Sequence, residues 1–152
     1  MSLPVLIVGG GIAGQTLACA LARRAMACEI VELRPDFQIA GAAMTLQGTA
    51  LRTLLDFGLV EETIAAGWTG DDHPVVFTDS RGETVLEPEL VNMVGETYPP
   101  QIAIRRQALH DVLQRGVRRA GVPVRMGTTV TALSDDGESV EAVLSDGTRS
   151  EE

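Results

Sequence analysis

Four glycines within six residues form the part of this sequence best suited to bind an anion. They follow an apolar run and precede a helical pattern, and Gly9, Gly11 and Gly14 fit the spacing GxGxxG. In that pattern the first glycine permits a tight turn, the second lets the backbone approach a diphosphate, and the third lets a helix pack closely against a strand. The diphosphate lies at the helix N-terminus, where free N–H groups and the helix dipole favour negative charge. The loop, with Ile12 and Ala13 in the first helical turn, is therefore predicted to bind a dinucleotide.

A carboxylate follows this loop at the distance expected of a ribose-binding residue. Glu32 ends the next apolar run, 18 residues after Gly14. A carboxylate there accepts hydrogen bonds from both hydroxyls of an adenosine ribose and repels a 2′-phosphate, so the predicted ligand is FAD or NAD rather than NADP. The alternative is a glycine-rich turn that binds no ligand, with Glu32 exposed to solvent. This alternative stays open because the chain holds 16 glycines, and glycine-rich turns also arise from composition alone.

The elements that hold the loop are predicted from the spacing of apolar residues. Leu3–Val8, rich in β-branched residues, suits a strand buried on both faces, and Cys28–Leu33 suits a second strand. Ile12–Ala25 between them has helical spacing, with Leu17 and Leu21 on its packing face. Two strands joined by one helix form a βαβ unit, which is parallel and right-handed in nearly all proteins. The predicted fold class is therefore α/β, with a Rossmann-like βαβ domain and a parallel sheet at residues 3–33.

The rest of the chain is predicted as helices, an irregular segment and a β-meander. Residues 45–120 hold the helices and the irregular segment, of which 71–100 give only weak strand signals. Turn signals at Asp136-Gly137 and Asp146-Gly147 favour a meander within 122–152. The expected elements are helices at 51–58, 60–66 and 106–120, weak strands at 75–78 and 84–86, and strands at 102–104, 122–126, 130–133, 140–144 and from 148 onward.

Composition argues against several classes of protein. The net charge of −9, with no basic stripe interleaved with aromatics, would repel a nucleic-acid backbone. The first apolar stretch lacks a basic leader and is interrupted by glycines, Gln15, Arg23 and Arg24, so it is neither a signal peptide nor a membrane span. We expect a cytoplasmic protein with no nucleic-acid or membrane partner. Cys19 and Cys28, without a CxxC motif or paired histidines, are expected to be buried, reduced thiols.

Four stretches, in order along nearly the whole chain, carry a family resemblance. They read VLIVGGGIAGQTLACALAR, IVELRPDF, GAAMTLQGTALRTLLDFGL, and IAIRRQALHDVL with the later VPVRMGTTVTAL. The first two suit many FAD or NAD proteins, whereas the third and fourth are more specific. Together they resemble the N-terminal portion of the FAD-dependent aromatic hydroxylases, the p-hydroxybenzoate hydroxylase-like flavoprotein monooxygenases.

The resemblance implies a role for each residue that matches the family's motifs. The loop at 9–14 would hold the FAD diphosphate, Glu32 the adenosine ribose, and Arg34 would lie near the adenine end. Val130 matches a residue whose backbone meets the adenine. Two alternatives stay open: Arg34 as a solvated loop charge, and Val130 as simple strand core.

The resemblance also implies contacts near the flavin. Arg106 matches the family's arginine that opens the helix after the IxI strand and reaches the phosphate and ribitol region of FAD. The alternative is an exposed arginine in the first turn, although a cation there opposes the helix dipole. Arg105 takes a place often filled by another residue, so only Arg106 inherits the role. Gly41–Met44 would pass close to the flavin ring. His110, placed on the polar side of its helix, and His73, in a loop, are assigned no chemistry, and no metal site is expected.

The activity implied by the resemblance is hydroxylation of a small molecule. In such enzymes NAD(P)H reduces FAD, and the reduced flavin uses O₂ to place an oxygen atom on an electron-rich, often aromatic, substrate. The flavin carries the chemistry, so no catalytic side chain is assigned. The expected function is an FAD-binding, NAD(P)H-dependent monooxygenase of aromatic or polyketide-like small molecules.

The chain departs from this family in length. Members are more than twice as long, and their later DG and GD motifs and the sheet of the substrate pocket have no counterpart here. We therefore expect residues 1–152 to be the N-terminal part of an FAD-binding domain, with the substrate domain largely absent, and to be inactive alone. Another FAD- or NAD-dependent oxidoreductase and a standalone dinucleotide-binding module stay open as alternatives, as does a homo-oligomer.

Overall fold

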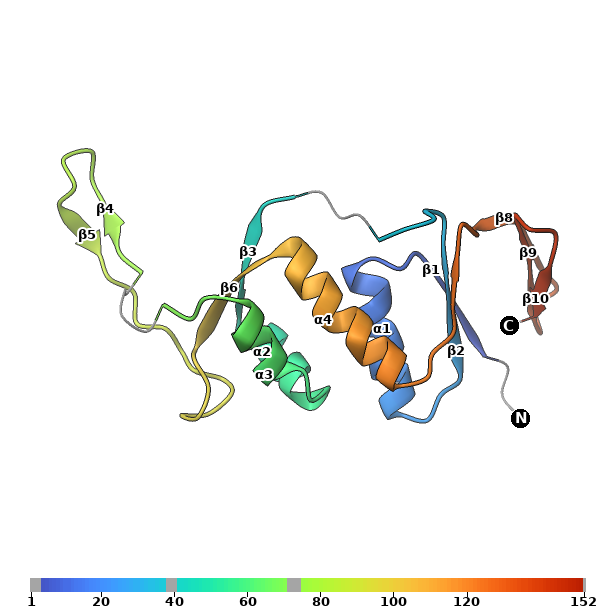
Figure 1. Cartoon of the computed structure of the whole chain (residues 1–152), viewed down its shortest axis with the longest axis horizontal. Helices are drawn as coiled ribbons and strands as arrows, with labels where there is room; N and C mark the ends of the chain where they lie inside the picture. Colours follow the sequence, from blue (N-terminus) through green and yellow to red (C-terminus); the bar gives the residue numbers. More distant parts are fainter. Residues whose placement is uncertain (1–3, 38–40, 71–74, 152) are drawn as a thin grey trace. The chain divides into compact units, whose positions relative to one another are not determined.

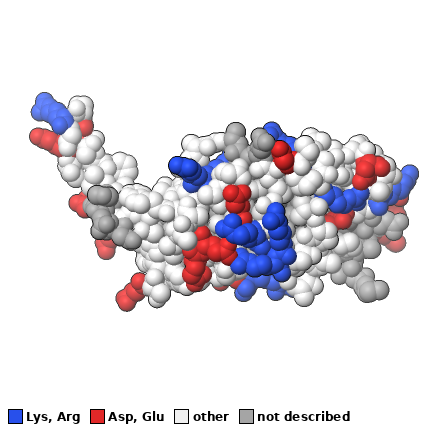
Figure 2. Space-filling view, in the orientation of Figure 1, with Lys and Arg blue, Asp and Glu red and all other residues white. Residues whose placement is uncertain are grey.

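The computed structural model describes residues 4–37, 41–70 and 75–151 (Figure 1). The chain forms two compact units. Unit 1 comprises residues 1–39 and 110–152, and unit 2 comprises residues 40–109. Within the described ranges, no helix is long and apolar enough to cross a membrane. The face shown in Figure 2 carries acidic side chains beside basic ones.

Unit 1 is built on a βαβ motif that carries the glycine loop. β1 (Val5–Val8) and β2 (Cys28–Glu32) pair in parallel, with Val8 opposite Val31, and α1 (Ile12–Arg23) connects them. β7 (Val124–Met126) pairs in parallel with the other edge of β2, which gives the order β1-β2-β7. The predicted parallel, Rossmann-like fold is therefore confirmed.

Two burial predictions for this motif were wrong. Of β1, only Ile7 is buried, and Val8 is 60% exposed, because β1 is an edge strand of the sheet formed by the described residues. The strand buried on both faces is instead the central one, β2, where Ile30 and Val31 are at most 1% exposed. On α1, Leu17 is 46% exposed, and the buried positions are Gln15, Ala18 and Cys19.

A β-meander completes unit 1, as predicted. β8 (Val130–Asp135), β9 (Val140–Leu144) and β10 (Arg149–Glu151) pair antiparallel in the order β10-β9-β8. Ala142 and Leu144 of β9 pack with Val31 of β2 in one buried cluster, which attaches the meander to the parallel sheet.

Unit 2 contains a two-stranded antiparallel sheet and two short helices. β3 (Ala43–Gln47) pairs with β6 (Gln101–Arg105), and α2 (Thr49–Asp56) and α3 (Val60–Ala66) follow β3 in the chain. The remaining elements are a hairpin of β4 (Phe77–Thr78) and β5 (Thr84–Leu86), and α4 (Arg106–Arg119), which begins at the end of β6 and continues into unit 1.

The sequence did not predict β3. Only Leu46 of its five residues is buried, so the strand has no strong apolar pattern of its own and is defined by its pairing with β6. The end of α3 was predicted correctly. A Cβ atom at Gly67 would lie 2.4 Å from Ile102 Cγ2 and 2.9 Å from the Ala103 carbonyl oxygen, so only glycine fits where the chain leaves α3 against β6.

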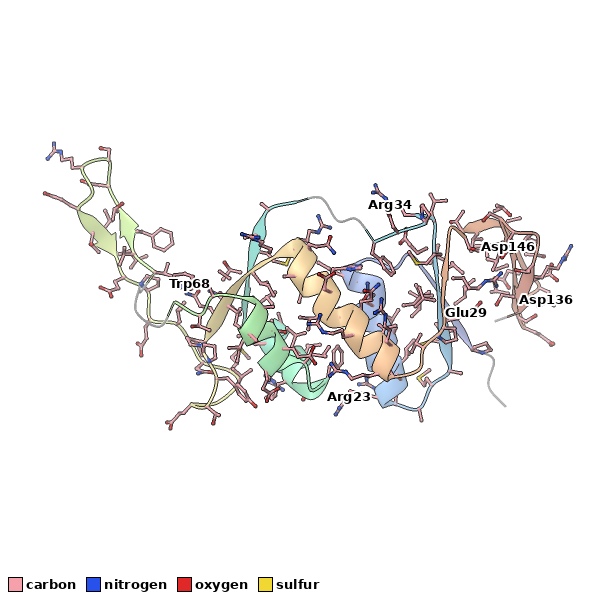
Figure 3. The ribbon with its side chains drawn as sticks, viewed as in Figure 1. Arg23, Glu29, Arg34, Trp68, Asp136 and Asp146 are labelled. Atoms are coloured by element: carbon pink, nitrogen blue, oxygen red, sulfur yellow. The ribbon has the colours of Figure 1, made fainter. Side chains whose placement is uncertain are left out.

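Asp146 joins the meander turn to the parallel sheet (Figure 3). Its carboxylate accepts hydrogen bonds from the hydroxyl and the backbone N–H of Thr148 and forms an ion pair with Arg125 of β7. The Thr148 hydroxyl, its backbone N–H and then Arg125 lower the pKa of Asp146 to about 2. The resulting stabilisation is therefore complete above the unfolded-state pKa of about 4 and is lost as the pH falls toward 2.

We expect Asp146→Asn to unfold at a lower temperature than the parent protein at pH 7. The difference should shrink as the pH is lowered from about 4 to 2, because the parent carboxylate then becomes protonated. Thermal unfolding followed by circular dichroism across this pH range measures it. Glu138→Gln removes the same charge from a side chain with no hydrogen bond or ion pair among the described residues. Equal effects of the two substitutions would contradict the assignment.

Candidate functional site

The glycines of the loop differ in what surrounds them. Gly9 has φ +106°, a conformation that other residues rarely adopt. At Gly14 a Cβ atom would lie 1.9 Å from the Gly9 carbonyl oxygen and 3.2 Å from Ile7 Cγ2, so α1 packs directly on the chain that leaves β1. Gly11 has φ −71°, and a Cβ atom there would meet no described atom within 4 Å. Gly9 and Gly14 are thus required by the fold, whereas Gly11 leaves open space beside the backbone.

The N-terminus of α1 is left uncapped by the described side chains. Gly11 is the N-cap residue and provides no side chain, and the first turn holds no acidic residue. The first intrahelical bond runs from the Gln15 N–H to the Gly11 carbonyl at 3.0 Å. The N–H groups of Ile12, Ala13 and Gly14 precede it and have no partner within the helix, so they and the helix dipole favour an anion at this end.

Glu32 is held next to the loop by two backbone hydrogen bonds. The Gly10 N–H donates to Glu32 Oε2 at 2.8 Å, and the Arg34 N–H donates to Oε1 at 2.9 Å. Each carboxylate oxygen still has capacity for another donor. The structure therefore brings together the predicted diphosphate loop and the predicted ribose-binding carboxylate. Arg34 follows directly and is exposed (Figure 3).

Val130 lies in the core at the start of β8. It is half-buried, pairs with Leu144 of β9 and packs against the cluster of Val31, Ala142 and Leu144. Its side chain thus serves the packing of the meander. A contact between its backbone and an adenine stays a prediction.

Arg106 and Gly41 lie together in unit 2. Arg106 is exposed at the start of α4, and its N–H donates to the Ala42 carbonyl at 3.3 Å. Gly41 has φ +144°, and a Cβ atom there would lie 3.2 Å from Arg106 Cδ. The two parts predicted to approach the flavin end of FAD are therefore adjacent. Arg105, the last residue of β6, is exposed and pairs with Ala43.

Sequence reasoning missed a buried polar pair beneath the loop and misplaced one member of it. His110, expected on the polar side of its helix, is 0% exposed, and Gln15 is 1% exposed. Gln15 Nε2 donates to the Gly10 carbonyl at 2.7 Å and lies 2.5 Å from His110 Nε2. The expectation for His110 was wrong because the buried stripe of α4 is wide: at 100° per residue, His110 lies about 60° from the buried Leu113.

Phe37 closes the other side of Gly10. A Cβ atom at Gly10 would lie 2.7 Å from Phe37 Cε1 and 3.3 Å from Glu32 Cβ. The ring of Phe37 also packs against the His110 ring, with centroids 4.7 Å apart. Gly10, which the GxGxxG pattern leaves unspecified, is therefore also crowded, although by side chains, whereas Gly14 meets backbone.

Neither cysteine belongs to the site. Cys19 and Cys28 are free and buried, which confirms that prediction. Burial raises the pKa of both thiols, and the nearby Cys28 raises that of Cys19 further, so both are protonated at neutral pH. Within the described part of the chain, no group of His, Cys, Asp and Glu could hold a metal ion. His73 lies outside the described residues.

The sequence matches the family model for an FAD binding domain over residues 2–152. The chain belongs to this family. Among its relatives, the aurachin C monooxygenase/isomerase of Stigmatella aurantiaca is 31% identical, over 95% of this chain and 37% of its own length. The 3-hydroxybenzoate 6-hydroxylase 1 of Aquipseudomonas alcaligenes is 29% identical, over 94% of this chain and 36% of its own length. The predicted resemblance to FAD-dependent monooxygenases is therefore confirmed.

Solved structures of other enzymes share the fold. A variant of 2-methyl-3-hydroxypyridine-5-carboxylic acid oxygenase aligns with a TM-score of 0.78 at 23% identity, over 98% of this chain and 37% of the other. The flavin-dependent monooxygenase PieE, in complex with FAD and substrate, aligns with a TM-score of 0.76 at 24% identity, over 99% of this chain and 28% of the other. This FAD-binding domain chain thus spans little more than a third of the first relatives it matches.

The different surroundings of Gly11 and Gly14 give a matched pair of substitutions. Gly11→Leu should leave the fold intact, because the new side chain enters open space and φ at this position is allowed for leucine. It should weaken FAD binding about tenfold or more, because the side chain blocks the approach of the diphosphate. Gly14→Ala should destabilise the protein by roughly 1–3 kcal/mol through overpacking. Urea unfolding and FAD titration measure the two effects. Unchanged FAD affinity in Gly11→Leu would show that the ligand does not approach this backbone.

Proposed function

We propose that this chain provides the dinucleotide-binding part of an FAD-dependent, NAD(P)H-using monooxygenase of aromatic or polyketide-like small molecules. The observation that carries the proposal is the uncapped N-terminus of α1 beside the Glu32 carboxylate. This arrangement offers hydrogen-bond donors to a diphosphate and acceptors to a ribose within one short stretch of backbone.

The proposed diphosphate site consists of backbone groups. Gly11, Ile12, Ala13 and Gly14 supply N–H groups at the positive end of α1, and the missing side chain at Gly11 lets phosphate oxygens come close. Gly9 shapes the turn that brings these groups together. No lysine is available for this task, since all 12 basic residues of the chain are arginines.

The proposed adenosine site is next to it. Glu32 accepts hydrogen bonds from the ribose hydroxyls through lone pairs that the Gly10 and Arg34 N–H groups leave unused. Arg34 and the backbone of Val130 face the adenine. In unit 2, Arg106 binds the phosphate and ribitol region, and Gly41–Met44 passes the flavin ring.

Bound FAD supplies the redox chemistry, and the residues of this chain bind and orient it. The proposed substrate class is supported by relatives named 3-hydroxybenzoate 6-hydroxylase and 4-methyl-5-nitrocatechol 5-monooxygenase. A homo-oligomer is supported by a structural neighbour solved in a tetrameric form. The proposed location is the cytoplasm.

The proposal is tested by titrating the purified 152-residue chain with FAD in equilibrium dialysis. We expect weak, saturable binding to the parent chain and an affinity about tenfold lower, or lower still, for Gly11→Leu. We expect no substrate-dependent NAD(P)H oxidation, because the chain spans little more than a third of its first relatives. A parent chain that retains no FAD would overturn the assignment, and steady turnover by this chain alone would overturn the expectation of inactivity.

Glu32 should also determine which nucleotides bind. We expect the parent chain to prefer ADP to adenosine 2′,5′-bisphosphate, because the carboxylate accepts the 2′-hydroxyl and repels a 2′-phosphate. Glu32→Gln should bind ADP about tenfold more weakly, since the hydrogen bonds to a charged acceptor are lost, and should discriminate less between the two nucleotides. Calorimetric titration measures both constants.

Glu29→Gln is the matched control for this substitution. Glu29 lies on the same strand, three residues before Glu32, and its loss changes the net charge equally (Figure 3). The same loss of ADP affinity in both variants would mean that overall charge, rather than Glu32, determines binding.

A further inference from the structure

The Gly10 carbonyl is approached by two buried side chains from distant parts of the sequence. Gln15 Nε2, on the first turns of α1, is 2.7 Å from the carbonyl oxygen, and His110 Nε2, on α4, is 3.0 Å from it. The two nitrogen atoms are 2.5 Å from each other. All three residues are buried, so this contact lies inside unit 1.

The hydrogens of the Gln15 amide explain the arrangement. Its nitrogen has two N–H groups, of which one donates to the Gly10 carbonyl and the other to His110 Nε2. His110 is therefore an acceptor at Nε2 and carries its proton on Nδ1. An amide flipped by 180° would place two oxygen atoms 2.7 Å apart, which excludes that orientation.

These contacts fix the direction of the next N–H group. The Gly10 carbonyl and the Gly11 N–H belong to one planar trans peptide, in which they point in opposite directions. With the carbonyl held toward the interior, the Gly11 N–H points outward. A Cβ atom added at Gly11 would meet no described atom within 4 Å, so the backbone there is open. The Gly10 N–H is held separately by Glu32 Oε2.

We propose that Gln15 and His110 are positioning residues that hold the Gly10–Gly11 peptide with its N–H directed at a diphosphate oxygen. This inference rests on the proposed dinucleotide function. Without such contacts the peptide would be free to rotate, because glycines on both sides of it impose little restriction. Ligand binding would then have to order it at a cost in affinity.

The pair is a poor choice for stability alone. Gln15 Oε1 and His110 Nδ1 are both buried and have no hydrogen-bond partner among the described residues. Each such atom costs about 1–3 kcal/mol relative to a solvated one. Apolar side chains of similar size would avoid that cost, so a pair with a purely structural role should be replaceable at little cost in stability.

The test separates diphosphate binding from adenosine binding. ADP and adenosine share the adenine and the ribose and differ only in the diphosphate, so their affinities, measured by ¹⁵N–¹H NMR titration, report on the two parts separately. We expect His110→Leu to weaken ADP binding about two- to threefold, because Gln15 still donates to the carbonyl. Gln15→Met should weaken it more, because His110 accepts from Gln15 and has no N–H to offer the carbonyl. The double variant should weaken it about tenfold or more and leave adenosine affinity within about twofold.

A control variant distinguishes positioning from packing. Leu113→Ala removes a buried side chain from the same helix and should lower the unfolding temperature without changing the ratio of ADP to adenosine affinity. The double variant should lose less stability than Leu113→Ala. Its ratio of ADP to adenosine affinity should nevertheless fall, whereas that of Leu113→Ala should not. An unchanged ratio in the folded double variant, in a parent chain that binds ADP, would overturn this inference alone. A parent chain that binds neither ADP nor FAD would overturn the proposed function and this inference with it.

Discussion

The closeness of α1 to the end of β1 is the constraint on which the site depends. At Gly14 the two elements leave no room for even one methyl group, since a Cβ atom would lie 1.9 Å from the Gly9 carbonyl oxygen. This contact places the N-terminal turn of the helix, whose first N–H groups have no partner within the helix, next to the end of β1. Because β2 pairs in register with β1, its last residue, Glu32, lies next to the loop that follows β1. Loop, helix end and carboxylate are thus positioned by one packing contact and one strand pairing.

The same geometry allows an anion-binding loop and a carboxylate to lie side by side. A free carboxylate would repel a diphosphate at this distance, but Glu32 accepts N–H groups from Gly10 and Arg34, one on each oxygen. These hydrogen bonds offset part of its negative charge and hold it against the loop at Gly10. Glu32 therefore stabilises the glycine loop in the ligand-free fold. The same carboxylate is the group proposed to bind the ribose.

The features that could be predicted from the sequence are those that short-range patterns of residues determine. The βαβ unit, the bounds of α3 and the turns of the meander follow from apolar spacing and glycine positions, and the place of Glu32 follows from the regular geometry of parallel strands. The pairing of β3, the exposure of Val8 and the burial of His110 depend on neighbours far away in the chain. One local signal of the buried pair of Gln15 and His110 was present in the sequence. Gln15 is a polar residue among small apolar ones on the inner face of α1, and a buried polar side chain usually has a hydrogen-bond partner.

Gln15 and His110 connect the Gly10 carbonyl to different parts of the chain, Gln15 directly and His110 through Gln15. Gln15 lies five residues further along the same loop and helix, so its hydrogen bond moves with α1 and preserves the internal shape of the turn. His110 lies 100 residues from Gly10 in sequence and belongs to α4. It accepts the second N–H of the Gln15 amide, so it holds Gln15, and through it the turn, in place within unit 1. Phe37 packs against the His110 ring and lies beside Gly10, which limits the movement of the turn on that side. A loop made flexible by its glycines is thus made rigid by side chains that never reach its ligand-facing surface.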